Sequence, residues 1–575
     1  MAEAADGAPT PLQASRGAGR SMKKPTLIFL LGLLGALILG PLAVLLITSF
    51  SSPETLFYRE FTFTFQNYLD VATRPGTAKL IWNTFYYAAA SVVLGVSIAF
   101  VLSMLTERTD MPARRLIRTL MFSWMAVPPL VFGYGWILLI NPGNGALNVF
   151  LRNLFGFEGA PFSPYSMTAL IVISSLSLVP TSYVMISGLL RNMDPSLEDA
   201  GFVMGAGRLR VFRTVTLPIL TPGFLSVGMF LFINMVQTFD LPLVLGASAG
   251  VHVLSTRIYL LASPEVGLPN YGLAGAFGVF LLVVALLLMV YYFHVTRLSE
   301  RFRVVTGRGF RPKRLTLGVW RLPALLFTGG YFAVMTLPLL ILLWSSLLPF
   351  YKVPSLDELA NLTVGAYGRI LGDPTIMRAI GNTVLMVLVS SVVVMVLSCL
   401  ISWFSVRAQS AATRALDVMA FAPIAIPPVV MAIAMLLFFL PTPLYGLIWV
   451  IVIGHITMFI AFGARTMNGA FIQIHKELED AAEISGASWG TSLRRVVAPL
   501  VWPHIVNAWL WVAAHSARDL TFPLILLTSS NVVVASKIYM TWGYPDLPGA
   551  AALSMLMVGA LMAVVIPIQY FRADD

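Results

Sequence analysis

Long apolar stretches without charge alternate with short charged segments along the chain. Eleven stretches of at least 22 residues carry no charged side chain: 25–53, 80–106, 119–151, 159–190, 214–239, 266–296, 322–351, 379–406, 418–464, 496–517 and 547–571. A membrane-spanning helix needs about 20 apolar residues. The stretch 418–464 has twice that length, and Pro441-Thr442-Pro443 interrupts it, which predicts a turn between two helices because proline lacks the amide hydrogen. The pattern predicts an all-α integral membrane protein with twelve transmembrane helices.

The composition agrees with a chain that lies mostly in lipid. Hydrophobic residues make up 58% of the sequence and charged residues 11%, and the mean hydropathy is +0.84. A soluble domain carries about 25% charged residues, and water-soluble packing of this chain could not cover so much apolar surface. The first apolar stretch is too long for a signal-peptide core, so we expect a retained helix. Residues 1–22 are rich in Ala, Gly, Ser and Pro, which predicts a disordered cytoplasmic tail.

The distribution of basic residues predicts the orientation. The net charge is +11, from 37 Lys and Arg against 26 Asp and Glu. With the N-terminus inside, 27 of the basic residues fall in segments on the cytoplasmic side and 10 fall elsewhere. Lys and Arg gather on the cytoplasmic side of membrane proteins. We therefore expect both termini to be cytoplasmic, and the basic charge requires no nucleic-acid partner.

The second half of the sequence repeats the first. Asn83-Thr84 matches Asn382-Thr383 at an offset of 299 residues, and Asp199-Ala200 matches Asp480-Ala481 at an offset of 281. Each copy contains six predicted helices, so both copies enter the membrane in the same direction. The sequence predicts two parallel six-helix units at 23–297 and 321–575, joined by a basic cytoplasmic linker at 298–320.

Each half contains the same kind of loop between its fourth and fifth predicted helices. The first loop, DPSLEDAGFVMGAGRLRVFRTVTLPIL, begins at Asp194, and the second, HKELEDAAEISGASWGTSLRRVVAPLV, begins at His475. Asp194 followed by Pro195 favours a helix start, and Gly205 favours its end. The pattern predicts an amphipathic elbow at the membrane surface that is open to a cytoplasmic partner. An ordinary interfacial connecting helix is the alternative.

These loops resemble the signature of the permease subunits of type I ABC importers: Glu-Ala-Ala, three residues, Gly, nine residues, a branched aliphatic residue, one residue, Leu-Pro. The spacing matches in both copies, with Asp in place of Glu in each, Gly201 in place of the second Ala, and Ala498 in place of Leu. The fused six-plus-six layout is similar to the Fbp-type ferric-iron permeases and the thiamine permeases. The candidate coupling residues are Glu198, Asp199, Ala200, Gly205, Pro218, Glu479, Asp480, Ala481, Gly486 and Pro499.

The resemblance implies a multi-pass permease in a bacterial inner membrane. It implies a periplasmic solute-binding protein and two copies of a cytoplasmic ATPase as partners, with ATP and Mg²⁺ bound by the ATPase. This chain has no Gly-Lys pair, so it contains no P-loop and we expect no enzyme and no cofactor. The resemblance favours ferric iron as the solute, with thiamine, polyamine or phosphonate as alternatives. A twelve-helix secondary transporter is the alternative of a different class, and a membrane-bound enzyme lacks a catalytic set in this sequence.

Ionisable residues inside membrane segments are candidates for the solute pathway, because a charge in lipid is costly. Asp240, Arg518 and Asp519 lie in the fifth and eleventh predicted helices. Pairing with a neighbouring helix end is the other interpretation of these charges. Pro128-Pro129 and Pro427-Pro428 lie in the middle of the third and ninth predicted helices and predict kinks, either beside a pathway or for packing. The six histidines show no metal-ligand spacing, so no metal site is expected.

Overall fold

The protein is described by a computed structural model that covers residues 24–52, 62–191, 193, 196–264, 266–300, 315–408, 410–475, 477–543 and 546–572. These residues form helices and loops, with two isolated β-bridges and no longer strand. The all-α fold is confirmed. The tail 1–22, the Asp194-Pro195 helix start and most of the linker 298–320 lie outside the described residues.

The helices of the two halves correspond in order. The first half contains a helix from Lys24 to Ser49 that includes η1 Gly35–Leu39 and α2 Gly40–Ser49, followed by α3 Gln66–Thr73, α4 Thr77–Arg108, α5 Arg114–Trp124, α6 Pro129–Ile140, α7 Ala146–Phe155, α8 Met167–Arg191, α9 Ser196–Val203, α10 Arg208–Val211, η2 Phe212–Thr216, α11 Leu217–Gln237, η3 Pro242–Gly246, η4 Ala247–Ala249, α12 Leu254–Ala262 and α13 Tyr271–Glu300. The second half contains η5 Gly318–Trp320, α14 Arg321–Ser346, η6 Asp357–Asn361, α15 Gly365–Gly372, α16 Pro374–Arg407, α17 Ala411–Phe421, η7 Ala422–Ala425, α18 Pro428–Phe439, α19 Ile448–Gln473, α20 Glu477–Ile484, α21 Trp489–Ser492, η8 Leu493–Val497, α22 Ala498–Arg518, α23 Thr521–Ile525, α24 Val534–Trp542 and α25 Leu547–Arg572.

Ten of the described helices are long and apolar enough to cross a membrane, and three bent helix pairs raise the number to thirteen if each pair is one span. Two of these pairs fall on the third and ninth predicted helices. The third, Pro242–Ala249 with Leu254–Ala262, was not predicted from the sequence. The predicted number of twelve transmembrane helices lies between ten and thirteen and stays a prediction. The turn at 441–443 is confirmed, because α18 ends at Phe439 and α19 begins at Ile448.

The prolines break the third and ninth predicted helices more sharply than the kinks expected from the sequence. The chain bends by 100° between α5 and α6 and by 107° between η7 and α18. Pro128 and Pro427 are extended at the helix boundary, and Pro129 and Pro428 begin the new helices, where a missing amide hydrogen costs nothing. The resulting helices α6 and α18 are apolar and almost completely buried. The prolines therefore direct two apolar helices into the centre of the molecule.

Within each half, one long helix pair forms the main packing seam: α4 lies along α8, and α16 lies along α19. Hydroxyl side chains close both seams. Ser103 on α4 donates to the carbonyl oxygen of Tyr183 at 3.4 Å, and Ser402 on α16, its counterpart at offset 299, donates to that of Ala464 at 2.9 Å. Small residues let membrane helices approach closely, and their hydroxyls bond across the interface.

The first helix of each half packs against the other half. Helix α2 packs on α18, and α14 packs on α6. The contact between α14 and α6 is close, because a Cβ atom added to Gly135 would lie 2.4 Å from the carbonyl oxygen of Pro338. This reciprocal exchange joins the two repeated units into one body around the buried helices α6 and α18.

The repeated Asn-Thr pairs hold the short helices α12 and α24 at equivalent places. Thr84 accepts a hydrogen bond from the amide of Leu254 at 2.9 Å, and Thr383 accepts one from the amide of Val534 at 2.9 Å. Asn382 donates to the carbonyl oxygen of Val532 at 2.9 Å. The sequence repeat therefore extends to matching tertiary contacts.

Candidate functional site

The two elbows have the same geometry. In the first, α9 is followed by Gly205, which has a φ of +81°, and then by α10 and the fifth long helix α11. In the second, α20 is followed by Gly486, with a φ of +86°, and then by α21 and α22. Left-handed backbone at the end of a helix favours glycine. Pro218 and Pro499 lie in the first turns of α11 and α22, where they fit the helix start.

An arginine at the end of a neighbouring long helix holds each elbow. Arg108, the last residue of α4, lies 2.5 Å from the Glu198 carboxylate, which also accepts a hydrogen bond from Thr216 at 2.6 Å. Arg407, the last residue of α16, lies 2.6 Å from the Glu479 carboxylate. The two arginines are related by the offset of 299 residues and the two glutamates by the offset of 281.

The second elbow is held by more hydrogen bonds than the first. Trp403 Nε1 donates to Glu479 Oε2 at 3.0 Å, and Arg407 donates to the carbonyl oxygen of Ile474 at 2.8 Å. The side chains of Arg407 and Glu479 are each only 10% exposed. Buried charges are stable only when they are paired and hydrogen-bonded, so this pair fixes the start of α20 to α16.

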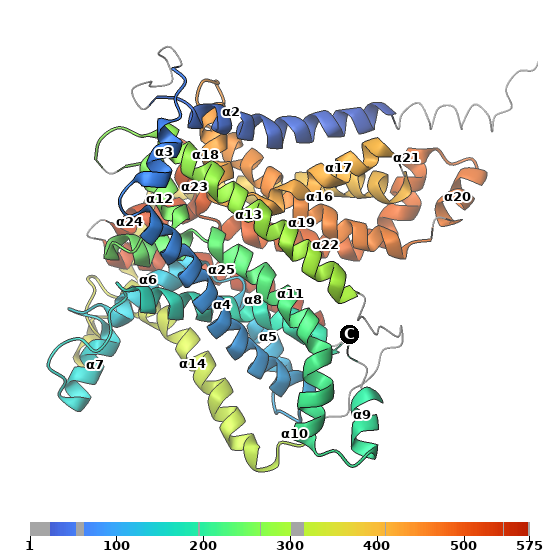
Figure 1. The fold of residues 1–575 in the computed structure, drawn as a ribbon. Helices are drawn as coiled ribbons and strands as arrows, with labels where there is room; N and C mark the ends of the chain where they lie inside the picture. Colours follow the sequence, from blue (N-terminus) through green and yellow to red (C-terminus); the bar gives the residue numbers. More distant parts are fainter. Residues whose placement is uncertain are drawn as a thin grey trace, which may run out of the picture.

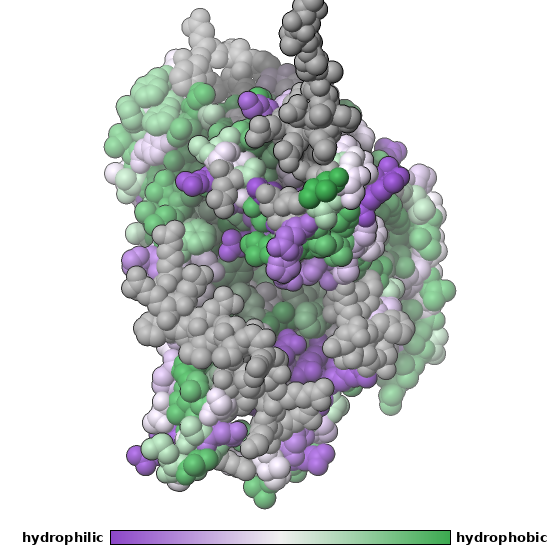
Figure 2. Space-filling model, turned by 90° about the vertical axis from the view of Figure 1, so that its right-hand side faces the viewer, coloured by the Kyte–Doolittle hydropathy of each residue, from purple (hydrophilic) through white to green (hydrophobic). Residues whose placement is uncertain are grey.

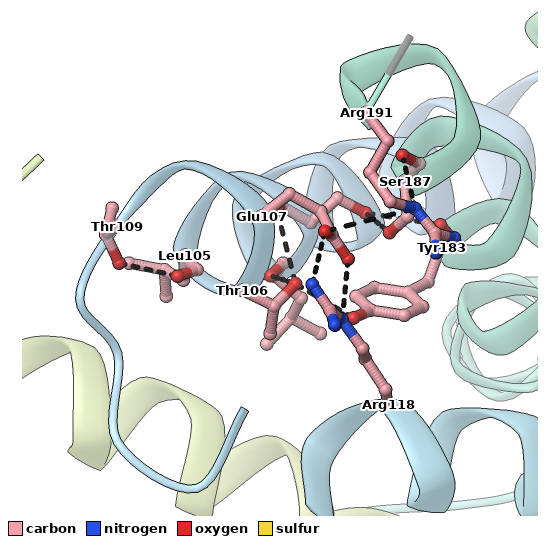
Figure 3. A network of polar contacts seen from close by, with 10 residues as sticks. Leu105, Thr106, Glu107, Thr109, Arg118, Tyr183, Ser187 and Arg191 are labelled. Carbon is pink, nitrogen blue, oxygen red and sulfur yellow. Dashed lines mark hydrogen bonds and ion pairs between the residues drawn. The ribbon is translucent and has the colours of Figure 1, made fainter. Parts of the chain in front are cut away.

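A second polar network ties together the helix ends beneath the first elbow (Figure 3). Arg118 on α5 donates to both carboxylate oxygens of Glu107, at 3.0 and 2.5 Å, and Arg191 of α8 lies 4.0 Å from the same carboxylate. Thr106 and Tyr183 share a hydrogen bond of 2.8 Å nearby. The ends of α4, α5 and α8 are thus joined around one buried glutamate, next in sequence to the Arg108 that pairs with Glu198.

The tips of both elbows expose apolar side chains. Val203 and Met204 are 88% and 87% exposed, and Ile484, the counterpart of Val203, is 77% exposed. Ala200 and Ala481 are exposed on the same helices. Asp199 is partly buried, while the side chain of Asp480 lies outside the described residues. The two elbows therefore expose apolar side chains at matching positions.

The elbows lie at the ends of two arms of the molecule (Figure 1). Helices α4, α8 and α11 lead to α9 and α10, and helices α16, α19 and α22 lead to α20 and α21. Figure 2 looks at this end of the molecule and shows the surface set back between the two arms, with hydrophobic residues in the recess.

The predicted intramembrane charges come together where the two halves meet. Asp240 follows the end of α11, Arg518 is the last residue of α22, and Asp519 caps α22. Arg518 interacts electrostatically with Asp240 and Asp519. Thr521, which matches Asp240 at the repeat offset of 281, lies with its hydroxyl 3.5 Å from the Asp240 carboxylate. We call Asp240, Arg518, Asp519 and Thr521 the central cluster.

The central cluster is bonded to one of the proline breaks. The Arg518 guanidinium donates a hydrogen bond to the carbonyl oxygen of Met125, which caps α5 just before Pro128. The broken span of the first half is thereby tied to the eleventh predicted helix. This hydrogen bond joins one of the three charges to a neighbouring helix end. That these charges line a solute pathway stays a proposal.

A buried histidine extends the central cluster within the second half. His455 is fully enclosed, and its Nε2 lies 3.0 Å from Asp519 Oδ2, which also accepts from the amide of Phe522 at 3.1 Å. Its Nδ1 lies 2.8 Å from the hydroxyl of Ser516. At offset 281 the first half has Ser174 instead, which accepts a hydrogen bond from Tyr87 at 2.9 Å. The two halves therefore carry different polar groups at matching positions.

The sequence did not identify Arg108, Arg407 and His455 as site residues. The arginines carried a usable signal, because each lies within two residues of the end of an uncharged stretch and the repeat offset relates them. His455 carried no such signal, because its partner Asp519 lies 64 residues away on another helix. Among the described residues, no three His, Cys, Asp or Glu side chains are placed to hold a metal ion.

Replacing Arg518 with methionine is expected to destabilise the protein by about 1.5–3 kcal/mol, the range for a hydrogen bond to a charged group. The substitution keeps the length of the side chain but leaves Asp240 and Asp519 without their shared cation. Thermal unfolding of the purified protein in detergent measures the loss. The double variant Arg518→Met with Asp240→Asn should recover part of it. Equal stability of Arg518→Met and the original protein would show that the cluster contributes nothing.

Comparison with known proteins finds similar sequences among transport proteins of bacterial membranes. A family model described as "Binding-protein-dependent transport system inner membrane component" matches residues 91–304 and 395–571, once in each half. The putative ferric transport system permease protein FbpB 1 of Haemophilus influenzae is 23% identical over 83% of this chain and 75% of its own length. The ferric transport system permease protein FbpB of Actinobacillus pleuropneumoniae is 23% identical over 90% of this chain and 75% of its own length.

A chain of a bacterial ABC transporter for alginate, solved by crystallography, is also similar. It is 19% identical, with a TM-score of 0.40, over 49% of this chain and 94% of that chain. The family model covers more than half of this sequence and finds the same unit in both halves. This chain is a transport component of the inner membrane, not an enzyme, and it belongs to the family of binding-protein-dependent transport system inner membrane components, the permeases of ABC importers.

Proposed function

We propose that this permease imports ferric iron. A periplasmic binding protein delivers the ion, and two copies of a cytoplasmic ATPase bind the two elbows. ATP and Mg²⁺ bind to the ATPase. Both termini and the linker 298–320 lie on the cytoplasmic side with the elbows. The support for iron is the name of the relatives, two of which are ferric transport permeases that align with most of this chain.

The observation that carries the ATPase proposal is the matched pair of elbows. Each elbow presents an exposed aliphatic residue, Val203 or Ile484, on a short helix that an arginine–glutamate pair holds to its own arm. A force on α9 is therefore transmitted to α4 through the ion pair of Arg108 with Glu198. In the same way, a force on α20 is transmitted to α16 through the ion pair of Arg407 with Glu479. Two ATPase subunits that approach each other would bring the two arms together.

The central cluster is the proposed gate of the pathway. It joins Asp240 of the first half to Arg518 and Thr521 of the second, and Arg518 is bonded to the break before α6. Relative movement of the arms would strain these bonds, because their partners belong to different halves. The side chains of Asp240, Arg518 and Asp519 are partly exposed, so a solute that passes between the halves would meet them.

The test is transport by the reconstituted complex. The permease, expressed with its ATPase and its binding protein, is placed in proteoliposomes, and uptake of radioactive ferric iron is measured with and without ATP. We expect the ATPase to co-purify and uptake to require both ATP and the iron-loaded binding protein. Transport by the permease alone without nucleotide would instead indicate a secondary transporter.

The solute is tested separately from the mechanism. The native binding protein is purified and its bound ligand is identified by mass spectrometry and metal analysis. Ferric iron is the expected ligand. Thiamine, a polyamine or a phosphonate on that protein would overturn the iron proposal and leave the ATP-driven mechanism in place.

A further inference from the structure

The first half contains an additional segment that the second half lacks. Between α6 and α8 the first half is 18 residues longer, and this segment includes α7. Asn148 fixes it: its side chain is fully buried, donates to the carbonyl oxygens of Ile140, Asn141 and Phe162 at 2.8–3.0 Å, and accepts from the amide of Phe162 at 3.1 Å. The segment is thus a built structure with one defined orientation.

Helix α7 packs Ala146 and Leu147 against the core but turns a second apolar surface outward. Phe150, Leu154 and Phe155 point outward and are 58%, 59% and 64% exposed. On the other side, Arg152 donates hydrogen bonds to the carbonyl oxygens of Pro142 and Gly143. A helix at a water surface turns its apolar side inward. The outward apolar side of α7 therefore requires an apolar environment.

The position of α7 indicates what that environment is. Helix α7 stands outside the helix bundle beside α14, at the end of the molecule opposite α9 and α20 (Figure 1). It begins shortly after the membrane helix α6 ends at Ile140. Its depth is therefore that of the membrane surface remote from the elbows, where amphipathic helices bury Trp, Phe and Leu side chains in the lipid.

The apolar side of α7 has further aromatic neighbours. Phe157 and Phe162 follow it and are 51% and 49% exposed. Tyr351, which follows α14, bonds through its hydroxyl to the carbonyl oxygens of Leu138 and Asn144 at 3.0 and 3.2 Å, and Phe350 beside it is 75% exposed.

We propose that α7 lies in the membrane interface remote from the elbows, with Phe150, Leu154 and Phe155 inserted among the lipid acyl chains. An amphipathic helix binds there through its buried apolar area. The interaction fixes the level of the first half in the bilayer. The second half has no counterpart of α7 between α18 and α19, because only residues 440–447 join these two helices.

Spin labelling tests this proposal. In a Cys399→Ala background, which removes the single cysteine, one cysteine is introduced by Phe150→Cys or Leu154→Cys and labelled with a nitroxide. The protein is reconstituted in vesicles of phosphatidylethanolamine and phosphatidylglycerol without any binding protein. Collision rates with oxygen, which concentrates in lipid, and with a water-soluble nickel chelate give the depth of the label.

Two control sites set the scale. Val93→Cys, at a 67% exposed position on the membrane helix α4, is the lipid control, and Met204→Cys, at an 87% exposed elbow position, is the aqueous control. We expect the oxygen-to-nickel ratio at residues 150 and 154 to exceed the ratio at 204 several-fold and to approach that at 93. A ratio equal to that at 204 would overturn the proposal. Protection that occurs only after the binding protein is added would overturn it too, in favour of a docking site for that protein.

Discussion

Replacing Gly486 with valine is expected to reduce ATP-driven uptake several-fold while the protein still inserts in the membrane. Gly486 has a φ of +86°, and a Cβ atom there would meet no other atom within 4 Å. The effect comes from the backbone, because a left-handed conformation costs an L-residue about 1–2 kcal/mol and is a strong outlier for a β-branched side chain. The elbow would relax away from the shape that an ATPase binds.

The expected loss of ATPase association is about 5–30-fold, the equivalent of 1–2 kcal/mol. Co-purification of the ATPase and uptake in proteoliposomes measure it. Gly490→Val is the matched control, because Gly490 lies in the same elbow, has an ordinary φ and also has open space around its Cβ position. Gly205→Val should reproduce the defect in the first elbow, where φ is +81°. Full ATPase association of the Gly486→Val variant would refute the coupling role of Gly486. Equal defects in Gly486→Val and Gly490→Val would show that the size of the added side chain, and not the backbone conformation, causes the loss.

Removing Arg407 is expected to have the largest effect among the charged residues. Arg407→Ala leaves the Glu479 carboxylate, which is 10% exposed, with Trp403 as its remaining bonded side chain. Breaking a buried ion pair on one side costs about 3–5 kcal/mol, because the remaining charge stays buried without compensation. We expect α20 to detach from α16, with loss of ATPase association and uptake. The same change at Arg108 should act on the first elbow.

A double variant separates the cost of a buried charge from the positioning of the elbow. Arg407→Ala with Glu479→Leu removes both charges, so the unfolding temperature should recover, as it does when buried pairs are replaced by apolar residues. Uptake should not recover, because the elbow is still not held to α16. Recovery of both would show that the pair serves stability alone. Arg369→Ala is the control, because its 3.6 Å pair with Asp546 is about half exposed and should contribute little.

The sequence by itself determined the class of the protein, its repeat and the elbows. Long uncharged stretches can only be membrane helices, since no other solvent accommodates them, and a constant offset between matching residues reveals a duplicated unit. The spacing around Gly205 and Gly486 is a local feature, because a left-handed turn after a short helix depends on the few residues that form it. For this reason the sequence predicted the end of the short helix at Gly205, and both Gly205 and Gly486 have a positive φ in the structure.

Only the tertiary structure decided which residues act together across the chain. The sequence predicted kinks at Pro128-Pro129 and Pro427-Pro428. The size of the bends, 100° and 107°, depends on packing, because α6 packs against α14 and α18 packs against α2 of the other half. Arg407 and Glu479 are 72 residues apart, and Asp240 and Thr521 are 281 apart. Periodicity describes one helix at a time, whereas a charge pair depends on how two helices pack. The reciprocal exchange of the first helices, and with it the position of the central cluster, therefore follows from packing between the halves and from no local pattern.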